Sequence, residues 1–115
     1  MKDTFKLGVT YKPNVADMRE SPALAVIDLL LGKGADVSFH DPFVSSVQVA
    51  GQTFEGVELG DDSLGNADCV LIATDHQDYD FRRIVARAAL VVDTRNATSA
   101  ILTDTPDLRK KVYRI

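Results

Sequence analysis

Two cationic side chains, Lys12 and Arg95, each follow an apolar segment that has the character of a β-strand. An ammonium attracts a phosphate or carboxylate as a point charge, and a guanidinium holds a phosphate through two parallel donors. If both side chains reach one crevice, they predict an anion-binding site. Two other interpretations stay open: Lys12 as a solvated surface lysine, and Arg95 paired with Asp93 or Asp41.

His40 and His76 each lie beside an aspartate, in the sequences His-Asp-Pro and Asp-His, and this invites a metal or catalytic interpretation. Neither histidine has a second His or Cys nearby at the spacing of metal ligands. We therefore expect both to be hydrogen-bonding turn residues. The single cysteine, Cys69, begins an apolar run and is predicted to pack as a small hydrophobe, because a nucleophilic thiol needs an exposed, electropositive site.

The connection between the first predicted strand and the first predicted helix is long, at roughly eleven residues where about two to six are usual. It carries Lys12 and Arg19 together with Asp17 and Glu20. Long loops at a ligand-binding edge commonly carry function. For Arg19 the alternative is a structural ion pair with Asp17 or Glu20. The connection contains no glycine, so the glycine-rich dinucleotide fingerprint is absent, and the chain has no Walker loop.

Strands and helices are predicted to alternate along most of the chain. The predicted strands are residues 5–10, 36–40, 69–74, 90–93 and 112–115, with a hairpin at 47–50 and 53–57; the predicted helices are residues 21–31, 61–66 and 79–89. This order predicts an α/β fold, a doubly wound, mainly parallel five-stranded Rossmann-like sheet with helices on both faces. Ligands of such sheets bind outside the carboxyl ends of the strands, where the strand order reverses. Lys12, His40, His76 and Arg95 are all predicted to lie at that edge.

The composition limits the class of protein. The chain has 115 residues, 13 basic against 17 acidic, and a formal net charge of -4. Its length fits a single domain, residues 1–115. The charge argues against nucleic acid and membranes as partners, because both call for a basic surface. No apolar run approaches the roughly 20 residues that cross a bilayer, and a lone cysteine forms no internal disulfide, so we expect a cytoplasmic protein.

Four segments together resemble a known family. They are G-x-x-Y-K-x-x-x-x-D-x-R-E-S-P-A-L at residues 8–24, D-V-S-F-H-D-P at 36–42, A-T-D-H at 73–76 and V-V-D-T-R-N at 91–96. In this order they resemble the carboxy-terminal, nucleotide-sugar-binding domain of the UDP-glucose/GDP-mannose dehydrogenase family. The S-P-A-L and V-V-D-T-R-N-A segments look most similar to the branch that oxidises UDP-N-acetylhexosamines.

This resemblance implies a chemistry. Enzymes of the family oxidise the C6 hydroxyl of a nucleotide sugar to a carboxylate in two NAD-dependent steps, through a thiohemiacetal on a cysteine. The NAD-binding Rossmann domain, the helical dimerising segment and the catalytic cysteine belong to other parts of such enzymes, so the present chain alone is expected to be inactive. The implied partners are a UDP-sugar and the remaining domains of the same enzyme, which as a full-length protein is implied to be a homodimer or higher homo-oligomer.

The resemblance also implies roles for four residues. Tyr11 and Lys12 match the strand-end pair that contacts the sugar nucleotide, and Arg95 matches the substrate-binding arginine of the D-x-R segment. Arg19 matches the arginine that reaches towards NAD, which is bound mainly by the amino-terminal domain. No catalytic residue and no metal ligand is implied within the chain. A UDP-sugar is an anion, and binding energy gained far from C6 can position C6 for hydride transfer.

Two alternatives of other classes stay open. One is a non-catalytic signalling domain of flavodoxin-like topology, such as a receiver. A receiver needs an acidic pair after its first strand, where this chain has Lys12. The other is a structural α/β module whose cations pair only with its own carboxylates.

Overall fold

The computed structural model describes residues 3–9, 27–29, 31–34, 36–49 and 51–114, and contains one central sheet. Its strands lie in the order β2-β1-β5-β6-β7, and all of the pairings are parallel. The strands are β1 (Asp3–Leu7), β2 (Asp36–His40), β5 (Cys69–Ile72), β6 (Val91–Asp93) and β7 (Val112–Arg114). The predicted five-stranded parallel sheet is therefore confirmed.

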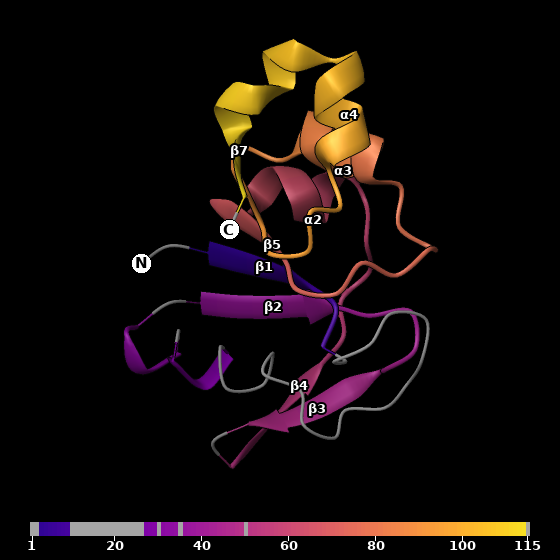
Figure 1. Ribbon diagram of the computed structural model, residues 1–115. Helices are drawn as coiled ribbons and strands as arrows, with labels where there is room; N and C mark the ends of the chain where they lie inside the picture. The colour runs from indigo at the N-terminus through magenta and orange to yellow at the C-terminus, as the bar shows by residue number, and fades with distance from the viewer. Residues whose placement is uncertain (1–2, 10–26, 30, 35, 50, 115) are drawn as a thin grey trace.

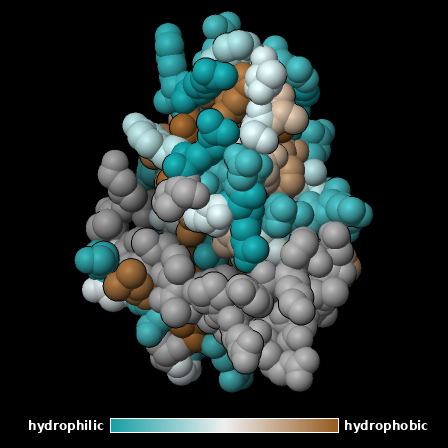
Figure 2. Space-filling view, viewed as in Figure 1, coloured by the Kyte–Doolittle hydropathy of each residue, from teal (hydrophilic) through white to brown (hydrophobic). Residues whose placement is uncertain are grey.

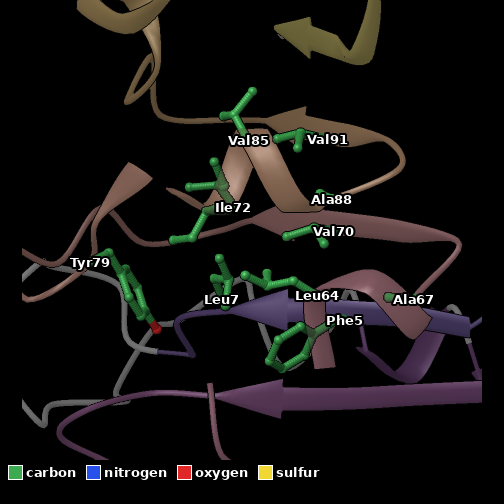
Figure 3. Close-up of a cluster of buried hydrophobic side chains, with 11 residues drawn as sticks. Phe5, Leu7, Leu64, Ala67, Val70, Ile72, Tyr79, Val85, Ala88 and Val91 are labelled. Atoms are coloured by element: carbon green, nitrogen blue, oxygen red, sulfur yellow. The ribbon is translucent and has the colours of Figure 1, made fainter. Parts of the chain in front are cut away.

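The alternation of side chains along β1 separates the two faces of the sheet. Phe5 and Leu7 join a core cluster with residues of β5, of α2 (Asp61–Asn66) and of α3 (Phe81–Arg87). Figure 3 shows this cluster between the strands and the helices. On the opposite face, Phe39 of β2 packs in a second cluster with Ile27, which belongs to the helical residues 27–29. Helices thus cover both faces, as predicted.

A small two-stranded sheet lies beside β2. Its strands, β3 (Ser46–Val49) and β4 (Gln52–Glu55), pair antiparallel, which confirms the predicted hairpin. Val47 and Val49 are buried in the same cluster as Phe39, so the hairpin extends the core past the edge of the main sheet. Figure 1 shows it beyond β2, at the end of the molecule away from α3 and α4.

Helix α3 is shorter than the predicted helix over residues 79–89. It begins after Asp80, whose carboxylate accepts a hydrogen bond from the amide of Arg83 at 3.3 Å. An aspartate at this position satisfies one of the unpaired amides of the first turn. Tyr79 therefore lies before the helix and not within it. The arginines of α3 face outwards as predicted, and their carboxylate partners are Asp104 for Arg82 and Asp61 for both Arg83 and Arg87.

Two short helices between β6 and β7 were not predicted from the sequence. They are α4 (Ser99–Asp104) and the 3-10 helix η1 (Pro106–Lys111). Only Leu102 of α4 is buried, so the segment lacks the repeated apolar positions by which a helix is recognised. In the view of Figure 2, hydrophilic residues make up most of the described surface at this end of the molecule.

Among the described residues, no helix has the length and apolar character needed to span a membrane.

Candidate functional site

The strand order reverses between β1 and β5. The chain moves from β1 outwards to β2 on one side, and then crosses back to place β5, β6 and β7 on the other side. The carboxyl ends of β1 and β5 are adjacent, because Leu7 is in register with Ile72. In open parallel sheets this is the place where a crevice forms and ligands bind.

Gly8 and Thr74 bring these two strand ends into close contact. Gly8 has a φ of 89° and donates its amide hydrogen to the carbonyl of His40 at 2.9 Å. A Cβ atom on residue 8 would lie 2.3 Å from the Cβ atom of Thr74. Only glycine fits, both for the positive φ and for the space. The position predicted as part of a strand is thus the point at which β1 ends.

Asp93 organises the turn that follows β6. Its carboxylate accepts hydrogen bonds from the amides of Arg95, Ala97 and Thr98 and from the hydroxyl of Thr98, at 2.7 to 3.1 Å. Burial alone would raise the pKa of Asp93, but these bonds together hold the pKa below its ordinary value. Asn96 adopts a positive φ of 57° in this turn, which asparagine tolerates better than most residues.

The guanidinium of Arg95 lies against the mouth of the neighbouring strand. Its Nε donates to the carbonyl of Ala73, just past β5, at 3.0 Å. Asp93 accepts from the main chain of Arg95, and the carboxylate of Asp41 is engaged elsewhere. The contacts therefore do not support the alternative in which the guanidinium pairs with Asp93 or Asp41. A cation is therefore held, half-buried, at the reversal of strand order, with its Nε bonded to a main-chain carbonyl.

Asp41 joins three strand ends. Its Oδ2 accepts from the amide of Val9 at 2.8 Å and lies 2.9 Å from Nε2 of His76, and its Oδ1 accepts from the amide of Phe43 at 2.8 Å. The side chains of Asp41 and His76 are fully buried. The prediction of hydrogen-bonding turn residues is confirmed for His76. It is wrong in part for His40, which is hydrogen-bonded but is the last residue of β2. The pairing of Asp41 with His76, 35 positions away, was not predicted.

Tyr79, which precedes α3, makes hydrogen bonds at the end of β2. Its hydroxyl donates to the carbonyl of His40 at 2.8 Å, and Nδ1 of His40 lies 3.3 Å from it. Burial raises the pKa of Tyr79, and the nearby carboxylates of Asp41 and Asp78 raise it further. Figure 3 shows the ring at the end of the core cluster, beyond the arrowhead of β1. Tyr79 is therefore a neutral hydrogen-bond donor that ties α3 to the end of β2.

Tyr11, Lys12 and Arg19, three of the four residues implied by the resemblance, lie outside the described residues. Of the four, the structure places only Arg95. Cys69 begins β5, at the opposite edge of the sheet from Arg95, and burial raises the pKa of its thiol, in line with the predicted role as a packing residue. A hollow of about 370 Å³ lies elsewhere, beside β2 and α2, and no cation is among the described residues that line it.

Sequence reasoning missed the buried Lys6, in the middle of β1. It is 1% exposed, and burial lowers its pKa to about 8. The signal was available, since Lys6 interrupts an apolar run between Phe5 and Leu7. Its side chain points to the face of the sheet opposite to those two residues. Lys6 lies in the middle of β1 and therefore does not belong to the site at the carboxyl edge.

The fold and its carboxyl edge define a Rossmann-like α/β class of domain. Residues 6–100 match the family model described as "UDP-glucose/GDP-mannose dehydrogenase family, UDP binding domain". The chain therefore belongs to the UDP-glucose/GDP-mannose dehydrogenase family and corresponds to its UDP-binding domain. This finding confirms the predicted resemblance and sets aside the signalling and purely structural alternatives.

Individual relatives agree with this assignment. The UDP-N-acetyl-D-mannosamine dehydrogenase of Methanococcus vannielii is 36% identical over 97 residues, which cover 77% of this chain and 21% of the relative. The UDP-glucose 6-dehydrogenase of Rhizobium meliloti is 37% identical over 98 residues, with coverages of 78% and 22%. The first is a relative of the predicted branch, but the second is equally similar, so identity alone does not select the sugar.

The solved structures give the same result. The NDP-N-acetyl-D-galactosaminuronic acid dehydrogenase of Methanosarcina mazei superposes with a TM-score of 0.68 at 26% identity, covering 99% of this chain and 24% of that one. The chain thus spans about a fifth to a quarter of the length of the relatives that it matches.

Proposed function

We propose that this chain is the nucleotide-sugar-binding domain of an NAD-dependent UDP-sugar 6-dehydrogenase, which oxidises the C6 hydroxyl of its substrate to a carboxylate. The family supports the reaction class, and the named relatives act on UDP-N-acetyl-D-mannosamine or UDP-glucose. The observation that carries the proposal is the place of Arg95. Its guanidinium is fixed against the carbonyl of Ala73 where the strand order reverses, the position at which such sheets bind ligands.

In this proposal the domain binds and orients the substrate. Arg95 takes the diphosphate, and Tyr11 and Lys12 of the first connection complete the contacts with the sugar nucleotide. A guanidinium recognises phosphate oxygens through two parallel donors, which gives orientation as well as charge. Holding the diphosphate firmly at a distance from C6 positions C6 for oxidation.

NAD is proposed to bind mainly to other domains of the full-length protein. The first connection contains no glycine in its sequence, so it lacks the glycine-rich fingerprint that holds the phosphates of a dinucleotide. Arg19 is the residue of this chain proposed to reach towards NAD. The catalytic cysteine is likewise proposed to lie outside this chain, because Cys69 is half-buried with a raised thiol pKa.

The full-length enzyme is proposed to be a homodimer or higher homo-oligomer in the cytoplasm. The dimerising segment of the family is not part of the UDP-binding domain, so association is expected of the whole enzyme and not of this chain. The proposed location is favoured by the lone cysteine of this chain, which forms no disulfide within it.

Calorimetric titration of the chain with UDP and, separately, with inorganic phosphate tests the proposal. We expect weak but measurable binding of UDP and much weaker binding of phosphate, because the uridine part adds contacts that a free anion lacks. Equal weak heats for the two ligands would contradict a nucleotide site and indicate nonspecific attraction of anions.

A further inference from the structure

We infer that the buried Asp41–His76 pair is a positioning device for the nucleotide-sugar site, setting the spacing between the end of β1 and the mouth of β5. The inference rests on the proposed function, since that function supplies the substrate site that is positioned. The positioning itself is argued from the hydrogen bonds of Asp41. Neither residue is proposed to touch the substrate.

The pair holds three chain segments through one carboxylate. The contacts at Asp41 come from Val9 after β1, Phe43 after β2 and His76 after β5. A main-chain N–H can only donate, so the carboxylate of Asp41 accepts from the amides of Val9 and Phe43. Nε2 of His76 is the natural third donor. A buried carboxylate that loses one of these donors is strongly disfavoured, so the three segments keep a fixed spacing.

His76 transmits this spacing towards Arg95. It lies three residues after Ala73, whose carbonyl accepts from Nε of Arg95. Its ring lies close to two aromatic rings, with centroids 5.0 Å from that of Phe43 and 5.7 Å from that of Tyr79. Rings at such separations favour one orientation. The short segment between Ala73 and His76 is thus fixed at both ends.

The other end of the device is Val9. Its amide donates to Asp41, and Lys12 follows three residues later in the sequence. One carboxylate therefore sets where the chain leaves β1 towards the predicted substrate-binding pair and, through His76, where the carbonyl that anchors Arg95 lies. A misplacement of about 1 Å is enough to weaken a site that depends on aligned charges.

Asp41→Asn tests the inference. An amide presents one oxygen and one NH2 group, so in either orientation it places a donor against Val9, Phe43 or His76 and loses at least one contact. We expect the amide resonances of Val9 and Phe43 to shift, the Nε–H of Arg95 to exchange faster with solvent, and UDP to bind about tenfold more weakly. Asp104→Asn, on the exposed partner of Arg82, is the matched control and is expected to change none of these.

His76→Gln is the second variant, because its amide still offers a donor to Asp41. We expect His76→Gln to keep the exchange of the Arg95 Nε–H as slow as in the unaltered chain. His76→Leu, which has no donor, is expected to make this exchange faster. Unchanged Arg95 exchange and UDP affinity in Asp41→Asn, with the Val9 resonance shifted, would overturn the inference. If Asp41→Asn does not fold, the contrast between Gln and Leu at position 76 decides by the same two readouts.

Failure of this inference and failure of the proposed function give different results. If the unaltered chain does not bind UDP, the proposed function fails. The exchange of the Arg95 Nε–H still reports whether the Asp41–His76 pair positions the guanidinium, since it needs no ligand.

Discussion

Gly8 and Thr74 lie so close that a side-chain carbon on residue 8 would come within 2.3 Å of the Cβ atom of Thr74. This contact joins the carboxyl ends of β1 and β5, the adjacent strands between which the strand order reverses. The same strand ends carry the contacts of Asp41 and the carbonyl that holds Arg95. The geometry of the proposed site therefore depends on one small residue that the sequence places inside an apolar run.

Gly8→Ala is expected to lower the free energy of unfolding by about 3 kcal/mol or more, from the clash with Thr74 and the positive φ together. Gly51→Ala is the matched control, because Gly51 also has a positive φ, of 78°, and nothing lies within 4 Å of its would-be side chain. Its expected cost is only about 1 kcal/mol. Urea denaturation of the two variants gives the comparison, and equal costs would show that the close approach of β1 and β5 does not constrain position 8.

Lys6→Met is expected to raise stability at pH 7. Burial lowers the pKa of Lys6 from 10.5 to about 8. A shift of this size corresponds to about 3 kcal/mol, an upper bound for the cost of keeping the buried lysine charged. Lys110→Met is the matched surface control, since Lys110 is exposed.

The advantage of Lys6→Met should depend on pH. Between about pH 8 and 10.5 the unfolded chain binds more protons at Lys6 than the folded chain does, so the stability of the unaltered protein rises with pH in this window. Below about pH 8 the full cost is present, and the variant is most favoured there. Unfolding free energies measured from pH 7 to 10.5 would contradict this account if the difference between variant and parent stayed constant.

Asp93→Asn is expected to lower stability at pH 7 by about 2 kcal/mol or more, because its carboxylate accepts hydrogen bonds from Arg95, Ala97 and Thr98. The folded pKa of Asp93 is depressed, so this contribution is present above the unfolded pKa and is lost as the pH falls through the folded pKa. The destabilisation caused by the substitution should therefore shrink in acid. Asp104→Asn, on the surface, should cost little at either pH, and a loss at position 93 that persists at low pH would argue against an ionised acceptor there.

The bounds of strands and helices could be predicted from the sequence where residues that interrupt regular structure mark an end. β2 and α2 have the predicted bounds: Asp-Pro follows β2, and Gly60 is the N-cap of α2. The prediction failed at α4 and η1, where burial rests on Leu102 and the partly buried Leu108, and where Pro106 looked like a break instead of a first helical residue. Tertiary packing, not local periodicity, decides such short helices.

The candidate site was predicted in the same partial way. Arg95 at a strand end could be inferred from the order of the elements, since all parallel strands place their carboxyl ends at one edge. The partners of Asp41 could not, because they depend on which strands are neighbours. The sequence predicted the edge to which Asp41 and His76 belong but not the strand order, and only the order β2-β1-β5 brings them within hydrogen-bond distance.

The affinity of the Arg95→Ala chain for UDP tests the central claim most directly. Arg82→Ala is the control for the loss of one positive charge. It removes an exposed arginine of α3 that pairs with Asp104 of α4. We expect calorimetry to show UDP binding in the unaltered chain and in Arg82→Ala, and its loss in Arg95→Ala. UDP binding that survives in Arg95→Ala at the affinity of the control would contradict the assignment of this guanidinium to the diphosphate.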